Sequence, residues 1–237
     1  NVVKFFHNFS KFARFLLSSK CYNRTMFALL KNFFTVLILS SPIYLWSDEN
    51  PYNFIDSNAQ KMVIVLKENK SLFFEDRQLY EQKIKEIFEP MIDFRRVAAT
   101  VMGKKYYLAS SKEQRAEFVV IFKDSLLDTY AETLAQWENQ TITTIFPKDD
   151  MEIQTNNLKN IEVQQTLNTG SSKYPISYKL RKNKDNSWSI VNIIVNGVNL
   201  GLTFRNQFQA LAIKNNGNIE STLNGWVSDA GDAGISG

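Results

Sequence analysis

The chain has 237 residues, enough for one large domain or two small ones, and carries a formal net charge of +4. Hydrophobic residues make up 44% and charged residues 22%, which is typical of a globular protein with an apolar core. The first 47 positions contain six basic residues and no acidic one, so the rest of the chain has 22 basic and 24 acidic residues, a net charge of −2. This near-neutral balance argues against a nucleic-acid-binding surface.

Residues 1–47 have the pattern of an export signal. We expect translation to start at Met26, with a short positive and then apolar segment over 31–39 and a cleavage site near Ser47. The apolar stretch is shorter than the roughly 20 residues that a membrane-spanning helix needs. The pattern therefore predicts a leader over 1–47 that is cleaved on export to the periplasm, with a retained membrane anchor as the alternative.

The only cysteine, Cys21, and the only histidine, His7, both lie in this leader. We expect the remainder to be one domain over 48–227, followed by a disordered tail over 228–237 that is rich in small and polar residues. That domain has no thiol or imidazole for catalysis, disulfide formation or zinc binding. It also has no Gly-rich phosphate loop, nucleophile elbow or metal-spaced carboxylate cluster. We therefore predict no catalytic residue, no metal and no cofactor.

Apolar residues at helical spacing predict helices in the first half of the domain, over about 51–69, 72–88, 92–102 and 110–137. Pro90 is expected to end the second helix and Gly103 the third. Ser110 or Ser111 is expected to cap the fourth, with a polar partner three residues further on. That fourth helix carries one broad apolar stripe with a residue every four positions: Phe118, Phe122, Leu126, Tyr130 and Leu134. Such a stripe is typical of a helix that faces the protein core.

After Asn139 the apolar period changes to two, which predicts strands over 142–146, 161–167, 176–182 and 188–195. A change of phase between Ile190 and Val191 indicates either a bulge in the last strand or burial of that strand on both faces. Two further helices are expected, over about 204–213 and 219–223. Helices followed by a meander of strands predict an α+β fold, with helices packed on one face of an antiparallel sheet.

Two sets of polar residues leave their roles open. Residues 104–107 are expected to form a short loop in which Lys104 and Lys105 stand beside two tyrosines. This loop would suit an anionic headgroup at the rim of an apolar space, or it is a surface loop whose rings enter the core. Arg115 and Arg205 lie near helix starts, where they could bind phosphate or pair with acidic side chains.

The run DFRRVAATVMGKKYY at 93–107, followed by ASSKEQR at 109–115, resembles the MlaC family. These are the periplasmic auxiliary proteins of the phospholipid-transport ABC system linked to toluene tolerance. The resemblance covers roughly 52–224 and continues through TYA at 129–131, ISYKL at 176–180, WSIVN at 188–192, VNGVNL at 195–200 and FRNQF at 204–208. The chain departs from the family in the extra cation Lys105, in Asn192 and Asn199 where Asp or Ser is expected, and in its Gly-rich tail.

The resemblance implies an NTF2-like curved antiparallel sheet of about four strands, covered by a layer of helices that encloses an apolar cavity for phospholipid tails. The lipid would be cargo, shuttled between an inner-membrane ABC transporter complex and an outer-membrane lipoprotein complex to maintain outer-membrane lipid asymmetry. Carried over by position, the residues expected to line the tails are Val97, Val101, Met102, Tyr106, Phe118, Phe122, Leu126, Tyr130, Val163, Tyr178, Ile190, Ile193, Val195, Phe204 and Phe208.

Two other hypotheses remain open. An NTF2-like enzyme of the isomerase or dehydratase type would need a carboxylate inside the apolar cavity, and the strand faces expected to point inward contain none. A membrane-anchored adaptor would instead bind a partner through the aromatic stripe and carry no ligand.

Overall fold

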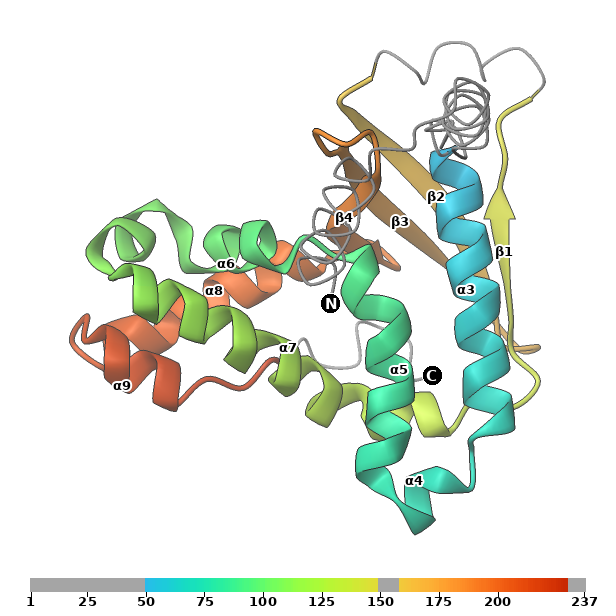
Figure 1. Ribbon diagram of the computed structural model, residues 1–237, viewed down its shortest axis with the longest axis horizontal. Helices are drawn as coiled ribbons and strands as arrows, with labels where there is room; N and C mark the ends of the chain where they lie inside the picture. Colours follow the sequence, from blue (N-terminus) through green and yellow to red (C-terminus); the bar gives the residue numbers. More distant parts are fainter. Residues whose placement is uncertain (1–49, 149–157, 230–237) are drawn as a thin grey trace, which may run out of the picture. The chain divides into compact units, whose positions relative to one another are not determined.

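The computed structural model describes residues 50–148 and 158–229, in which helices precede and follow an antiparallel sheet (Figure 1). The leader over 1–47 and positions 230–237 of the expected tail lie outside the described residues. In chain order the elements are α3 (Pro51–Glu68), α4 (Leu72–Glu75), α5 (Arg77–Met91), α6 (Phe94–Ala109), α7 (Lys112–Ala135), β1 (Thr141–Ile145), β2 (Asn160–Asn168), β3 (Lys173–Lys182), β4 (Trp188–Val195), β5 (Val198–Asn199), α8 (Leu200–Lys214) and α9 (Ile219–Asn224).

The sheet has five strands in the order β1-β2-β3-β4-β5, each antiparallel to its neighbour. The first four confirm the predicted strands, whereas β5 is too short for an alternating pattern to be visible. The predicted bulge is present, because Lys179 pairs with Asn192 and Leu180 pairs with Ile190, which leaves Val191 as the extra residue of β4. The bulge therefore keeps Ile190 and Ile193 on the same face of the sheet.

The prediction of one helix over 72–88 is wrong, because α4 and α5 are separate helices. Asp76 lies between them in a non-helical conformation (φ −150°, ψ 84°), and its carboxylate accepts the backbone N–H of Leu79 at 3.0 Å, which starts a new helix. Pro90 does not end α5 but lies inside its last turn. In the last turn a proline removes only one of the final backbone hydrogen bonds, so the helix continues to Met91.

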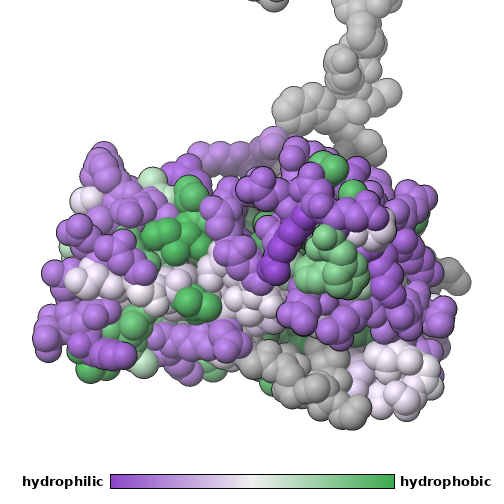
Figure 2. All heavy atoms as spheres, turned by 90° about the horizontal axis from the view of Figure 1, so that it is seen from below, coloured by the Kyte–Doolittle hydropathy of each residue, from purple (hydrophilic) through white to green (hydrophobic). Residues whose placement is uncertain are grey.

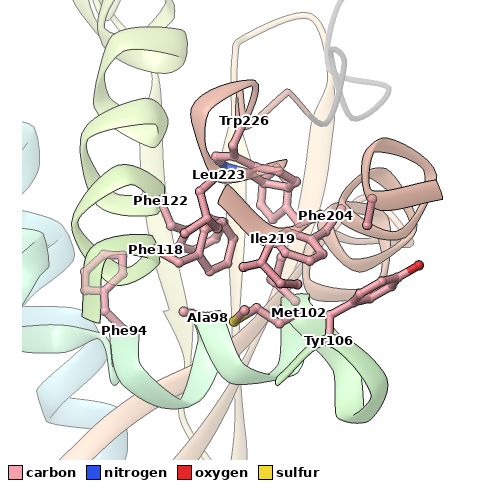
Figure 3. Close-up of a cluster of buried hydrophobic side chains, with 13 residues drawn as sticks. Phe94, Ala98, Met102, Tyr106, Phe118, Phe122, Phe204, Ile219, Leu223 and Trp226 are labelled. Atoms are coloured by element: carbon pink, nitrogen blue, oxygen red, sulfur yellow. The ribbon is translucent and has the colours of Figure 1, made fainter. Parts of the chain in front are cut away.

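Gly103 interrupts α6 instead of ending it. Its backbone leaves the helical region (φ 68°, ψ 163°), in a conformation that glycine adopts readily and other residues rarely do, and helical turns then resume up to Ala109. The predicted loop over 104–107 is therefore wrong, because these residues are helical. Figure 3 shows the consequence, since Tyr106 in the second half of α6 reaches the buried apolar side chains.

Helix α7 begins as expected. Ser111, rather than Ser110, is its cap, because the Ser111 hydroxyl accepts the backbone N–H of Gln114 and the Gln114 side chain accepts the backbone N–H of Ser111. The buried face then changes along the helix. Phe118 and Phe122 pack with α6, α8 and α9, whereas a second buried line, from Leu127 to Ala135, packs with α3 and α5.

The predicted disorder of the tail is wrong at its first residue. Ser228 is fully buried, its hydroxyl accepts the indole N–H of Trp226 at 2.9 Å, and its backbone N–H donates to the Ser125 hydroxyl. These bonds fix the chain after α9 against α7. Among the residues that the structure describes, no helix combines the length and the apolar character needed to cross a membrane.

Candidate functional site

Helices α6, α7, α8 and α9 surround a set of buried apolar side chains, which we call the helical cluster (Figure 3). Its members are Phe94, Ala98, Val101, Met102, Tyr106, Phe118, Phe122, Phe204, Phe208, Ala212, Ile219, Leu223 and Trp226. The Phe118 ring is central, with ring centroids 4.9 Å from Phe208 and 5.4 Å from Trp226, both edge to face. Aromatic rings prefer this arrangement, so the cluster is well packed.

Most of the helical residues predicted to line lipid tails meet in this cluster. Buried members are Val101, Met102, Tyr106, Phe118, Phe122, Phe204 and Phe208, and partly buried residues packed against it are Val97, Leu126 and Tyr130. The prediction omitted Phe94 and Ala98, although their spacing to Val101 places them on the same face of α6. It also omitted Trp226, which follows α9 in a segment without a helical pattern, so no local signal indicated it.

The predicted strand residues other than Val195 belong to a second group, the sheet cluster, which lies between α3 and one face of the sheet. Its buried members are Phe54, Ile55, Val163, Leu180, Trp188 and Ile190. Strand pairing places Val163 opposite Tyr178, and Tyr178 opposite Ile193, so these three residues form a row across the sheet. Val195 pairs with Ile176, and both lie on this face.

The two clusters adjoin at the junction between α5 and α6. Ile92 packs against both of them, and it forms an isolated parallel bridge with Ile190 of β4. The backbone N–H of Asp93 donates to the Ile190 carbonyl at 3.0 Å. The structure therefore divides the predicted residues between two neighbouring apolar clusters and joins these clusters through a hydrogen-bonded connection.

Several polar groups on the inner sheet face bond to one another, although the buried Oε1 of Gln165 has no hydrogen-bond partner among the described residues. The fully buried Gln165 donates to the Thr144 hydroxyl at 2.8 Å, and Thr144 donates to the carboxylate of Asp56 at 2.7 Å. Desolvation raises the pKa of the Tyr178 hydroxyl above its usual value. Within the described ranges, the fully buried polar side chains include no aspartate or glutamate, and no group of metal-binding side chains gathers. Asp56 of α3 brings a partly exposed carboxylate to the inner sheet face, where the Thr144 hydroxyl donates to it.

A cavity of about 510 Å³, which we call the α6–α7 groove, opens between α6 and the start of α7. It is lined by Arg95, Ala98, Ala99, Met102, Tyr107, Lys112, Arg115, Ala116 and Val119. The guanidinium of Arg115 lies 4.1 Å from the centre of the Tyr107 ring and donates to the Ser110 carbonyl at 2.8 Å. Arg205 does not line the groove; a Cβ atom on Gly103 would lie 3.2 Å from its Nε.

Large apolar side chains that remain exposed come from different elements, such as Phe74 (82% exposed), Leu108 (65%) and Ile213 (68%). On the face shown in Figure 2, hydrophobic residues form separate patches within a largely hydrophilic surface. The aromatic stripe of α7 is not presented in this way, because Phe118 and Phe122 are buried. An adaptor that uses the stripe as a contact surface would first have to expose it.

The family described as MlaC protein matches residues 56–228 of the chain. Among curated proteins, the chain is 26% identical over 208 residues to the toluene tolerance protein ttg2D of Pseudomonas putida, which covers 88% of this chain and 94% of that protein. It is 24% identical over 212 residues to the intermembrane phospholipid transport system binding protein MlaC of Haemophilus influenzae, covering 87% of this chain and 89% of that protein.

Among solved structures, the fold resembles that of a phospholipid-binding protein from Ralstonia solanacearum, determined in complex with a phospholipid. The TM-score is 0.65 and the sequence identity 22%, and the likeness covers 74% of this chain and 94% of the other. The α+β arrangement of helices and antiparallel sheet is thus shared between the two proteins.

Proposed function

Since this chain belongs to the MlaC family, we propose that it is a periplasmic carrier that holds the acyl tails of a phospholipid between the helical cluster and the inner face of the sheet. The observation that carries the proposal is the pair of adjoining apolar clusters, because together they contain nearly all the residues expected to line the tails. The names of the relatives support it, since one is a binding protein of an intermembrane phospholipid transport system and another was crystallised with phospholipid.

The chemistry of the cargo explains why such a protein would need two apolar surfaces. Two acyl chains contain on the order of 30 methylenes at about 0.8 kcal/mol each, so leaving them in water costs roughly 20 kcal/mol. A carrier must therefore cover the tails on all sides. Aromatic side chains on the helices and β-branched side chains on the sheet would provide the two walls.

The free-energy cost of exposing the acyl tails to water also suggests how lipid would be exchanged. Release without help would expose the tails to water, so we propose that partners separate the helical layer from the sheet during transfer. These partners would be an inner-membrane ABC transporter complex and an outer-membrane lipoprotein complex. In this proposal the leader is removed near Ser47, and 48–227 acts as one lipid-binding domain without catalytic activity or a resident cofactor.

The direct test is to export the full chain to the periplasm of a Gram-negative host, purify it without detergent, and compare its native mass with its denatured mass. We expect an added mass of one or two phospholipids, identified after extraction with organic solvent. A folded protein whose native mass equals that of the bare chain would overturn the proposal.

A matched pair of variants tests where the tails lie. Ile193 lies on the inner face of β4 in the row with Tyr178, whereas its neighbour Ile194 pairs with Ser177 on the opposite face. We expect Ile193→Glu to lose most of the bound lipid and Ile194→Glu to retain it, because only the first places a charge against the tails. Circular dichroism checks that each variant is folded, and Ile193→Trp, which fills space without adding charge, replaces Ile193→Glu if that variant unfolds. Equal lipid content in the folded pair would contradict this location.

A further inference from the structure

We propose that the α6–α7 groove binds the phosphate headgroup of the carried lipid and gives the protein a preference for anionic over zwitterionic phospholipids. This inference rests on the proposed carrier function and adds to it the class of lipid. The groove has a volume of about 510 Å³, within the range of roughly 300–1,000 Å³ that is usual for small-molecule sites.

The charge of the groove points to an anion. Three of its lining side chains are cationic, namely Arg95, Lys112 and Arg115, and none of its lining residues is acidic. In the described part of the chain, the ion pairs involve neither Arg95 nor Lys112. Three cations around one cavity favour a ligand with net negative charge.

One of these cations is already oriented. Arg115 stacks on Tyr107 and donates from two of its nitrogens to Ser110, at 2.8 Å to the carbonyl and 3.2 Å to the hydroxyl. A guanidinium has five N–H donors in a planar fork, so further donors remain for phosphate oxygens. A held guanidinium loses less conformational freedom on binding than a mobile one.

The floor of the groove connects this charge to the apolar interior. Ala98 and Met102 line the groove and are also buried members of the helical cluster, and Val119 and Tyr107 pack against that cluster. A phosphate between the cations would thus lie next to Met102, a residue expected to line the tails. A lipid whose headgroup also carries an ammonium would bring a positive charge to three others, whereas an anionic headgroup would not.

The test uses the full chain, exported in a host that makes both phosphatidylglycerol and phosphatidylethanolamine. Bound lipids are extracted and quantified by mass spectrometry, and their ratio is compared with that of the host membrane. We expect wild-type protein to be enriched in phosphatidylglycerol. The double variant Arg95→Gln/Lys112→Gln should lower the ratio of phosphatidylglycerol to phosphatidylethanolamine about two- to five-fold, as expected for the loss of two exposed charge interactions, while total lipid per chain stays the same.

A charge-matched control separates the groove from general surface charge. Lys61→Gln/Lys184→Gln also removes two exposed positive charges, but neither residue lines the groove, so the lipid ratio should not change. A ratio that is unaffected by Arg95→Gln/Lys112→Gln, or lowered equally by the control, overturns the inference and leaves the carrier function intact. Absence of lipid from every protein overturns the carrier function itself.

A second arm distinguishes a lipid headgroup from free phosphate. Inorganic phosphate is titrated into the lipid-bearing wild-type protein by calorimetry, and we expect no saturable binding because the groove is occupied. Saturable binding that is lost in Arg95→Gln/Lys112→Gln would identify a site for free phosphate and overturn the headgroup assignment.

Discussion

Tyr80 is fully buried among apolar side chains of α3, α5 and α7, and its hydroxyl has no hydrogen-bond partner within the described residues. This burial raises its pKa to about 12. A buried hydroxyl without a partner costs about 1–3 kcal/mol. The neutral Tyr80 hydroxyl therefore does not stabilise the fold, and the ionised hydroxyl would destabilise it.

We expect Tyr80→Phe to raise the free energy of unfolding by about 1 kcal/mol or leave it unchanged, because it removes an unpaired polar atom and keeps the ring. The variant should also lose less stability at alkaline pH. In the wild type, the Tyr80 pKa of about 12 in the folded state lies above the ordinary value of 10. Ionisation of Tyr80 therefore leaves the free energy of unfolding unchanged below pH 10 and lowers it as the pH rises toward 12.

Urea denaturation at pH 8 and at pH 11 measures both effects for Tyr80→Phe. The Tyr80→Phe variant should still lose some stability between pH 8 and pH 11, because burial also raises the pKa of Tyr178. A variant that is more than 1 kcal/mol less stable than wild type at pH 8 would show that the hydroxyl of Tyr80 has a stabilising partner.

At the scale of elements, the break in α6 directs the chain so that residues on either side of it reach the helical cluster. Met102 precedes the break and Tyr106 follows it, and both are buried. Gly103 makes the break possible through its positive φ of 68°. Its surroundings are also close, since a Cβ atom would lie 3.2 Å from both Arg205 Nε and Gln209 Nε2.

Gly103→Ala should lower the free energy of unfolding by about 1–3 kcal/mol, because alanine is strained in this backbone conformation. Gly217→Ala is the matched control: Gly217 also has a positive φ, of 77°, but no atom would lie within 4 Å of the new Cβ. The difference between the two urea midpoints measures the combined extra cost, at Gly103, of a ψ of 163° that almost only glycine adopts at positive φ and of crowding Arg205 and Gln209. Equal losses would show that neither adds to the cost of a positive φ.

At the scale of the whole molecule, lipid that binds between the two clusters should stabilise the fold. A ligand that binds only the folded state, at 100 times its dissociation constant, contributes about 2.7 kcal/mol. We therefore expect the protein stripped of lipid to melt at a lower temperature than the protein as purified, and readdition of phosphatidylglycerol vesicles to restore the difference. Differential scanning calorimetry measures both. Identical melting temperatures before and after lipid removal would contradict a ligand held in the interior.

Residues of the proposed site that lie inside a regular helix or strand could largely be predicted from the sequence. A repeat of four residues predicts that Phe118 and Phe122 face the core, and alternation along a strand predicts the face of Tyr178; their place in a lipid site, like that of Val163, is what the family resemblance implies. Trp226 could not be predicted, because it enters the helical cluster from an irregular segment. The break at Asp76 was also missed, since an apolar pattern shows which face is buried but not where a side chain caps a new helix.

By itself, the sequence determined the element types, most strand and helix positions, the change of phase at Val191 and the resemblance to one family. These properties depend on periodicity and on ordered local motifs, which neighbouring residues along the chain carry. Only the tertiary structure decided which side of α7 is buried along its length, because that depends on the elements packed against each part of the helix. It likewise decided that Arg95, Lys112 and Arg115 line one groove, since the approach of α6 and α7 brings their charges together.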